Sequence, residues 1–200
     1  SRMQNAGQSC IAAKRFIVEK SAKDAFTERV LHHIESIKQG DPTNAGTTMG
    51  PMARLDLAQS ILKQAHDTIA KGAKLLTAKI DADGCNVQPM LLDHVKPGMA
   101  AFDDETFGPL AVISTANDDT DAIRLANQSR YGLGAALWTQ DIDKANQLAR
   151  QIQAGSVFIN GLMRSDPRVP FGGIKLSGFG RELSEVGMRE FVNTKTIWVE

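Results

Sequence analysis

A thiol at the end of a polar stretch is the first feature of this chain that could do chemistry. Cys10 ends the run QNAGQSC and is followed at once by the largely apolar run IAAKRFIVE. Such a cysteine is either a small buried residue, as free cysteines often are, or a nucleophile at the edge of a core. A nucleophilic thiol needs a base or local positive potential to form the thiolate. The four histidines stand in no recognisable cysteine–histidine arrangement, so a papain-like dyad is poorly supported.

Two later stretches also carry residues that could take part in binding or catalysis. In DDETFGPL, residues 103–110, Glu105 lies at the entrance to an apolar strand, next but one to Phe107. It is either part of a solvated acidic turn or a carboxylate that accepts hydrogen bonds from sugar hydroxyls beside an aromatic face. The glycine-rich loop 161–182 lacks the GK[ST] ending of a phosphate-binding loop and the three glycines of a Rossmann fingerprint. Its glycines therefore indicate a tight, irregular path beside a site.

The elements that must position these residues follow from hydrophobic periodicity and turn signals. Strands are predicted over 14–19, 74–79, 88–93, 107–116, 133–139, 156–160 and 194–200. Helices are predicted over 22–38 with Ser21 as N-cap, 52–71 ended by Gly72, 120–128 begun by Asp118 or Asp119, 141–155 ended by Gly155, and 182–191. Residues 40–51 and 161–181 are expected to be loops and 81–84 a turn. The alternation of strands and helices predicts an α/β fold with a largely parallel sheet flanked by helices.

Composition limits the class of protein. The formal net charge is zero and the pI is about 6.9, so nothing indicates a nucleic-acid or membrane partner. The two cysteines, Cys10 and Cys85, form no framework of disulfides, which favours a reducing compartment and a cytoplasmic location. We predict no metal ligands, no membrane span and no signal peptide.

Taken in order, the motifs resemble those of the aldehyde dehydrogenase superfamily. QNAGQSC with the following IAAKR resembles its active-site cysteine motif. The later blocks that match are TTMGPMAR (47–54), NVQPMLLDHVKPGM (86–99), ETFGPL (105–110), YGLGAALWT (131–139), GSVFIN (155–160) and PFGGIKLSGFGRE (170–182). The resemblance covers essentially the whole chain, and several of the blocks are long and specific.

The resemblance implies a role for individual residues. Cys10 would attack the aldehyde carbonyl, with its own backbone N–H in the oxyanion hole. The resulting thiohemiacetal would give hydride to NAD or NADP and leave a thioester that water hydrolyses. Glu105 would hold the hydroxyls of the nicotinamide ribose, with Phe107 beside the ring. The substrate pocket would involve Gln4, Ile11, Arg164, Ser165 and Phe171. The resemblance implies structural roles for Asn160 and Gly173, and Cys85 is interpreted as a bystander.

The resemblance also implies a division of the chain and an assembly. Residues 1–190 would be the catalytic domain and residues 191–200 an oligomerisation strand, in a homodimer or homotetramer. The family's nucleotide-binding domain, its general-base glutamate and its oxyanion-hole asparagine precede the cysteine block, and these 200 residues contain none of them. We therefore expect the 200 residues to be inactive alone.

The blocks AAKRFIVE, INGLMRSDPRVPFGG and SGFGRELSEVG look most like those of bacterial succinate-semialdehyde dehydrogenases. A substrate with a carboxylate requires a cation or hydroxyl donors, which Ser165 with Arg164 or Arg168 could supply. Some members of that group have an arginine where this chain has Gln4. Three alternatives remain: another aldehyde, a cofactor-free thiol hydrolase that uses Cys10, and a non-catalytic fragment that forms oligomers through the strand TKTIWVE.

Overall fold

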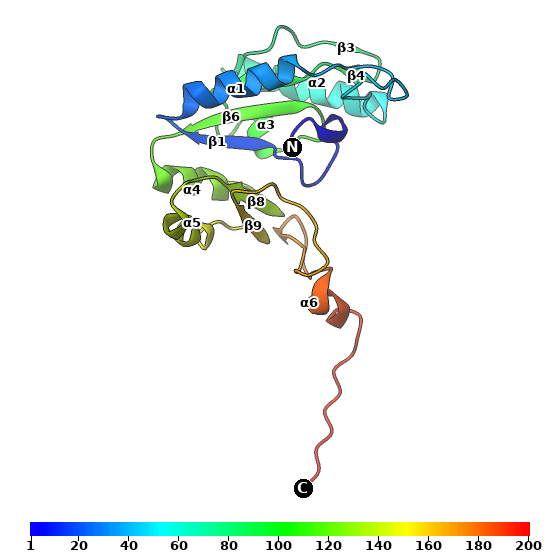
Figure 1. The fold of residues 1–200 in the computed structure, drawn as a ribbon, viewed down its shortest axis with the longest axis vertical. Coiled ribbons are helices and arrows are strands. Elements are labelled where there is room, and N and C mark those ends of the chain that lie inside the picture. The colour runs from blue at the N-terminus through cyan, green and yellow to red at the C-terminus, as the bar shows by residue number, and fades with distance from the viewer. The chain divides into compact units, whose positions relative to one another are not determined.

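The computed structural model describes residues 1–200 and divides them into two compact units (Figure 1). Unit 1 comprises Ser1–Ser129 and unit 2 comprises Arg130–Glu200. Both units combine strands with helices, which confirms the predicted α/β class. The division into a catalytic domain over 1–190 and a terminal strand stays a prediction. No helix combines the length and the apolar character that crossing a bilayer requires.

A four-stranded sheet forms the centre of unit 1, in the order β1-β6-β5-β2. The strands are β1 (Arg15–Glu19), β6 (Leu110–Ala116), β5 (Met90–Asp93) and β2 (Lys74–Leu75). β6 runs parallel to both β1 and β5, with Val112 opposite Arg15 on one side and Leu110 opposite Met90 on the other. β2 pairs antiparallel to β5. The sheet is therefore parallel in its middle, as predicted, and mixed at one edge.

Helices cover both faces of this sheet, because successive residues of a buried strand point to opposite sides. They are α1 (Lys23–Glu35), α2 (Leu55–Ala70), α3 (Ala100–Asp103) and α4 (Asp119–Asn127). Leu110 and Val112 of β6 belong to the apolar cluster that also contains Ile61 of α2 and Phe102 of α3. The alternate residues of β6, Ala111 and Ile113, pack in a second cluster with residues of α1. β6 is buried on both sides and anchors the unit.

The helix starts were predicted with mixed success. Asp118 is the N-cap of α4 and accepts a hydrogen bond from the backbone N–H of Asp121 at 2.8 Å, as expected. The prediction of Ser21 as a cap is wrong. The N-cap of α1 is Ala22, and the Ser21 hydroxyl donates instead to the carboxylate of Glu19 at 2.9 Å. α1 also ends at Glu35, three residues before the predicted end.

The region after α2 is broken into shorter pieces than predicted. β2 covers only Lys74–Leu75 of the predicted strand 74–79. The predicted turn over 81–84 is only partly correct, because β3 (Ala82–Asp83) and β4 (Asn86–Val87) pair antiparallel as a small hairpin. The chain turns at Gly84, whose φ is +58°, a value that glycine adopts without cost.

Unit 2 contains four short strands and two helices. They are β7 (Tyr131–Gly132), β8 (Gly134–Leu137), α5 (Ile142–Ala149), β9 (Ser156–Ile159), β10 (Ile174–Lys175) and α6 (Ser184–Arg189). β8 and β9 are parallel, with Gly134 opposite Ser156, and α5 connects them as in a βαβ unit. β10 and β7 are antiparallel.

The predicted helix over 141–155 is too long. α5 begins after Asp141, whose side chain caps it by accepting from the Lys144 N–H, but it ends at Ala149. The next residues form tighter i→i+3 bonds, such as that from the Gln151 N–H to the Leu148 carbonyl. Gly155 is a close-packing residue rather than a helix stop, since a side chain there would overlap the Gly172 carbonyl.

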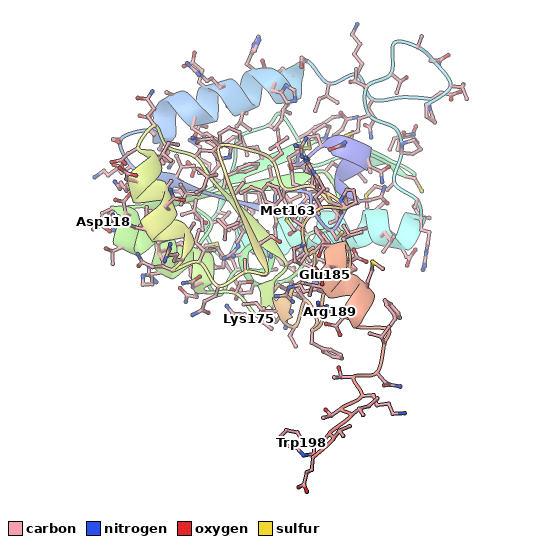
Figure 2. All side chains as sticks on the ribbon, turned by 60° about the horizontal axis from the view of Figure 1, so that its bottom comes forward. Asp118, Met163, Lys175, Glu185, Arg189 and Trp198 are labelled. Carbon is pink, nitrogen blue, oxygen red and sulfur yellow. The ribbon has the colours of Figure 1, made fainter.

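Residues 194–200 form no strand within this chain, in contrast to the prediction, because no segment of the chain pairs with them. They extend beyond α6 with their apolar side chains in solvent, and Trp198 is 82% exposed (Figure 2). A strand needs a partner edge for its backbone hydrogen bonds. Whether a second chain supplies that edge stays a prediction.

Candidate active site

The turn that carries Cys10 is held in an unusual backbone conformation. It begins with the short helical turn η1 (Gln4–Gly7), in which Asn5, Ala6 and Gly7 have φ values of +52°, +51° and +74°. Positive φ costs roughly 1–2 kcal/mol for a residue with a Cβ. The Asn5 amide donates to the Gln8 carbonyl at 3.0 Å and the Gln8 amide returns a bond to the Asn5 carbonyl at 3.3 Å. Cys10 follows, exposed to solvent.

This turn packs directly against the segment that carries Glu105 and Phe107. A Cβ on Gly7 would overlap the carbonyl group of Gly108, so the two backbones touch where Gly7 has no side chain. A Cβ on Gly108 would in turn overlap the Ile61 side chain of α2. The structure therefore brings together two of the three stretches that the sequence singled out, although nearly 100 residues separate them.

The two segments meet because of sheet topology. The Cys10 turn leads into β1 and the Glu105 segment leads into β6, and these are adjacent parallel strands. Their amino ends lie at the same edge of the sheet. This candidate site therefore lies at the amino ends of the strands, whereas ligands of open α/β sheets more often bind at the carboxyl ends.

α2 and the residues before it hold the site from one side. The Gln64 side-chain amide donates to the Glu105 carbonyl at 3.1 Å, and the Gln8 side-chain oxygen accepts from the Ala53 N–H at 2.9 Å. Sequence reasoning missed both glutamines. Gln8 lay inside the quoted cysteine motif, but nothing in the pattern indicated its distant partner.

Glu105 and Phe107 are both accessible, as a cofactor-binding role requires. Glu105 is exposed and no side chain donates a hydrogen bond to its carboxylate, so its oxygens remain open to accept from hydroxyl groups. Phe107 is 36% exposed. An open carboxylate two residues from an accessible ring fits the ribose and nicotinamide of NAD(P).

Three cationic residues flank Cys10 in the sequence, and none was predicted as part of the site. Arg2 is 4% exposed and donates to the Gly7 carbonyl, while Lys14 donates to the carbonyls of Phe102, at 2.8 Å, and Asp104. Arg15 donates to the Leu125 and Ala126 carbonyls at the end of α4, where a cation also complements the helix dipole. The available sequence signal was the pair of adjacent cations, Lys14 and Arg15, at the start of the predicted strand over 14–19.

Burial shifts the pKa values of these cations. Desolvation lowers the pKa of Lys14 to about 8, assisted by Arg15 and opposed by the carboxylates of Asp103, Asp104 and Glu105. Desolvation also lowers the pKa of Arg2 to about 10, and Glu105 opposes this shift. Glu105 is thus the acidic neighbour that both cations share.

The other predicted substrate residues lie in unit 2. Arg164 and Ser165 are exposed in the loop that follows β9. Phe171 is buried, and its backbone pairs with Glu182 through two hydrogen bonds of 2.9 and 2.8 Å. Gln4 and Ile11 share unit 1 with Cys10: Gln4 is exposed and Ile11 is half-buried.

Arg164 and Arg168 differ in what they bind. The Arg168 guanidinium makes a two-pronged ion pair with Asp166, with N–O distances of 2.9 and 2.7 Å. Hydrogen bonds from Arg168 and the charges of both arginines hold the pKa of the Asp166 carboxyl far below its usual range. Arg164 makes no ion pair and influences Asp166 only at longer range.

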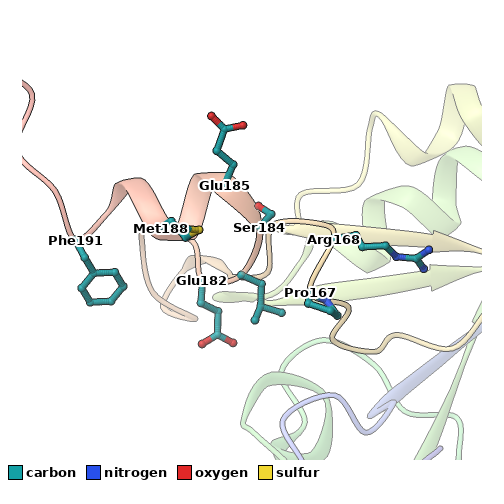
Figure 3. Close-up of a pocket in the computed structure, with 9 residues that line it drawn as sticks. Pro167, Arg168, Glu182, Ser184, Glu185, Met188 and Phe191 are labelled. Atoms are coloured by element: carbon teal, nitrogen blue, oxygen red, sulfur yellow. The ribbon is translucent and has the colours of Figure 1, made fainter.

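Unit 2 also contains a hollow of about 560 Å³ between α6 and the preceding loop (Figure 3). Its lining includes Pro167, Arg168, Leu183, Met188 and Phe191. None of the residues predicted for catalysis or cofactor binding lines it. It is therefore a surface feature of unit 2 rather than the candidate active site.

The alternative of a cofactor-free thiol hydrolase can be compared with the geometry. No side chain of these 200 residues hydrogen-bonds the Cys10 thiol, so the geometry gives that alternative no support. No group of three or more histidine, cysteine, aspartate or glutamate side chains is arranged to hold a metal ion.

Comparison with known proteins identifies the family. The model of the aldehyde dehydrogenase family matches residues 1–197, and the chain belongs to that family. It is 47% identical over 199 residues to the succinate semialdehyde dehydrogenase (NAD(P)+) Sad of Escherichia coli, a match that covers 98% of this chain and 43% of that protein. It is also 47% identical over 201 residues to a probable succinate-semialdehyde dehydrogenase (NADP+) of Synechocystis, covering 100% and 44%.

A solved structure agrees. The succinic semialdehyde dehydrogenase of Streptococcus pyogenes, solved with NADP+, superposes with a TM-score of 0.94 at 37% identity and covers 100% of this chain and 44% of its own. The chain thus spans less than half the length of the relatives that it matches.

Proposed function

We propose that the protein to which these residues belong oxidises an aldehyde to a carboxylic acid, with Cys10 as the nucleophile and NAD+ or NADP+ as the hydride acceptor. The observation that supports this most strongly is the contact between Gly7 and Gly108. It joins the turn with the exposed thiol to the segment with the exposed Glu105 and Phe107. Membership of the aldehyde dehydrogenase family agrees with it.

The residues of this chain would act as follows. The Cys10 sulfur forms a bond to the aldehyde carbon, and negative charge moves to the carbonyl oxygen. The backbone N–H of Cys10 makes no hydrogen bond within the protein and is free to donate to that oxygen. Glu105 would accept hydrogen bonds from ribose hydroxyls and so orient the hydride acceptor.

When bound, NAD(P)+ supplies the two-electron acceptor that this oxidation requires. Loss of hydride from the carbon attached to sulfur converts the Cys10 adduct into a thioester. Water then cleaves the carbon–sulfur bond, which releases the acid and restores the Cys10 thiol. We expect the 200 residues alone to be inactive, because the relatives carry more than half of their length outside the match.

Succinate semialdehyde is the substrate that we propose, since the relatives with 47% identity bear that name. Its carboxylate needs a cation with free donors. Arg164 has them, whereas the charge of Arg168 is neutralised by its two-pronged ion pair with Asp166. Ser165, adjacent to Arg164, can add a hydroxyl donor, and Gln4 an amide.

Comparing Arg164→Gln with Arg168→Gln tests this substrate. In the longest chain that the gene encodes, Arg164→Gln is expected to raise KM for succinate semialdehyde roughly 10- to 100-fold, the value of a lost charged hydrogen bond. It should leave KM for an uncharged aldehyde such as butanal unchanged. Arg168→Gln, the matched control, should change neither KM by more than a few-fold. Equal effects of Arg164→Gln on both aldehydes would contradict the assignment.

We further propose that the protein forms a homo-oligomer through residues 191–200. Ile197, Trp198 and Val199 are each about four-fifths exposed, and a segment of this composition with free backbone groups can pair with a sheet edge of a second copy. Light scattering of the intact chain should give a multiple of the monomer mass, and a chain ending at residue 190 should be monomeric. A monomer mass for the intact chain would contradict this proposal. The same result would rule out the alternative of a non-catalytic, oligomer-forming fragment.

The free thiols of Cys10 and Cys85 support a reducing, cytoplasmic location for the protein.

A further inference from the structure

The proposed chemistry requires two segments, far apart in sequence, to be aligned to within a fraction of an ångström. A misplacement of about 1 Å can cost roughly 100-fold in rate. The Gly7–Gly108 contact shows that the segments touch. A contact between two glycines supplies little attraction, so other groups must hold the alignment.

Lys14 connects the Cys10 side to the Glu105 side. It lies four residues after Cys10, and its ammonium donates to the carbonyls of Phe102 and Asp104, 88 and 90 positions further along the chain. Asp104 immediately precedes Glu105. The three donors of an ammonium group allow it to bind both carbonyls at once.

Arg2 acts from the other side of Cys10. Its guanidinium is buried, donates to the Gly7 carbonyl, and feels the charge of Glu105. Its Nε is buried with no hydrogen-bond partner. Arg2 therefore engages the Cys10 turn directly and the Glu105 segment through charge.

Arg2 is buried and Lys14 is half-buried, and withdrawing two cations from water contributes little net stability to a fold. Desolvation of a charge costs several kcal/mol, and apolar replacements of buried charges are often neutral or stabilising. The thioether side chain of methionine could fill the space of Lys14 or Arg2. The charges of Arg2 and Lys14 are therefore better explained by alignment of the two segments than by stabilisation of the fold.

We infer that Arg2 and Lys14 are positioning residues, which bracket Cys10 in sequence and hold its turn in register with the segment that carries Glu105. The expected effect on catalysis rests on the proposed function. The tethering of the Glu105 segment to the Cys10 turn does not, because it concerns only contacts within this chain. Neither residue touches substrate in this scheme.

The structural part is tested by hydrogen exchange in the 200-residue chain. Lys14→Met and Arg2→Met are expected to speed exchange of the backbone amides in 102–108 at least several-fold, because the segment loses its tethers. Lys20→Met and Arg29→Met are matched controls, since both side chains are exposed on unit 1. Lys14→Arg, which keeps charge and donors, should restore slow exchange. If Lys14→Met does not fold, Lys14→Gln is tested in its place, because glutamine keeps hydrogen-bond donors but carries no charge. Unchanged exchange in both tether variants would overturn the inference.

A pH series tests in solution whether the half-buried Lys14 ammonium is desolvated. The charged groups that act on it are Arg15, Asp103, Asp104 and Glu105. Between pH 8 and 10.5 the unfolded chain binds a proton at Lys14 that the folded chain has lost, so stability rises with pH in this window. The urea midpoint of the parent should rise relative to that of Lys14→Met over this range. A constant difference would mean that Lys14 is not buried, against the inference.

The catalytic part is tested in the longest chain that the gene encodes. Lys14→Met and Arg2→Met are expected to lower kcat/KM about 10- to 100-fold and to raise KM for NADP+, with recovery in Lys14→Arg. If the parent oxidises no aldehyde, the proposed function fails and the exchange experiment alone decides the positioning role. If the parent is active and neither variant changes kcat/KM or KM, the positioning role is wrong while the proposed function stands.

Discussion

Replacing Cys10 by alanine is expected to lower kcat for aldehyde oxidation by a factor of roughly 10³ to 10⁶, the range seen when a covalent nucleophile is removed. The physical reason is that no other thiol lies in the turn that packs on the Glu105 segment. Because Cys10 is exposed, the substitution should change the free energy of unfolding by no more than about 0.5 kcal/mol. Initial rates of NADPH formation and urea unfolding measure the two quantities.

Cys85→Ala is the matched control for Cys10→Ala. Cys85 is half-buried and packs against the main apolar cluster, in the turn of the β3–β4 hairpin. Its replacement should cost some stability and leave the rate within a few-fold of the parent. Full activity in Cys10→Ala, or equal losses in the two variants, would rule out Cys10 as the nucleophile.

Gly7→Ala is expected to have the largest effect on stability. Its φ of +74° disfavours any side chain, and the new Cβ would overlap the Gly108 carbonyl and crowd the Arg2 guanidinium. Neither backbone can move without disturbing β1 or β6. We expect a loss of roughly 2–4 kcal/mol, which corresponds to a fall in Tm of about 5–15 °C. The same displacement should reduce turnover strongly in the active protein.

Gly46→Ala provides the control for Gly7→Ala. Gly46 lies in the same unit, has no positive φ, and would meet nothing within 4 Å if it carried a Cβ. Its Tm should change by no more than about 2 °C, since surface substitutions usually stay within about 0.5 kcal/mol. A Tm for Gly7→Ala as high as that of Gly46→Ala would mean that the two segments are not packed as the structure has them.

Several features were accessible from the sequence because their causes are local. β6 was predicted from its long apolar run, the start of α4 from Asp118, and α2 from its apolar stripe. Errors arose where local signals compete. Ser21 stands one residue before the true N-cap, and Gly155 is a packing residue that resembled a helix stop. Residues 194–200 form no strand within the chain because a strand requires a partner that these 200 residues do not supply, and their pairing with a second chain stays a prediction.

By itself the sequence determined the candidate chemistry: the thiol of Cys10, the carboxylate of Glu105, the ring of Phe107 and the family to which the motifs belong. Those are properties of residue type and order. Only the tertiary structure decided that the turn with Cys10 and the segment with Glu105 are in contact, at the amino ends of two adjacent parallel strands. It also separated Arg168, paired with Asp166, from Arg164, and it revealed Arg2 and Lys14. Such contacts join residues that lie as far apart in the sequence as Gly7 and Gly108, and they depend on strand order and backbone packing, which no local pattern encodes.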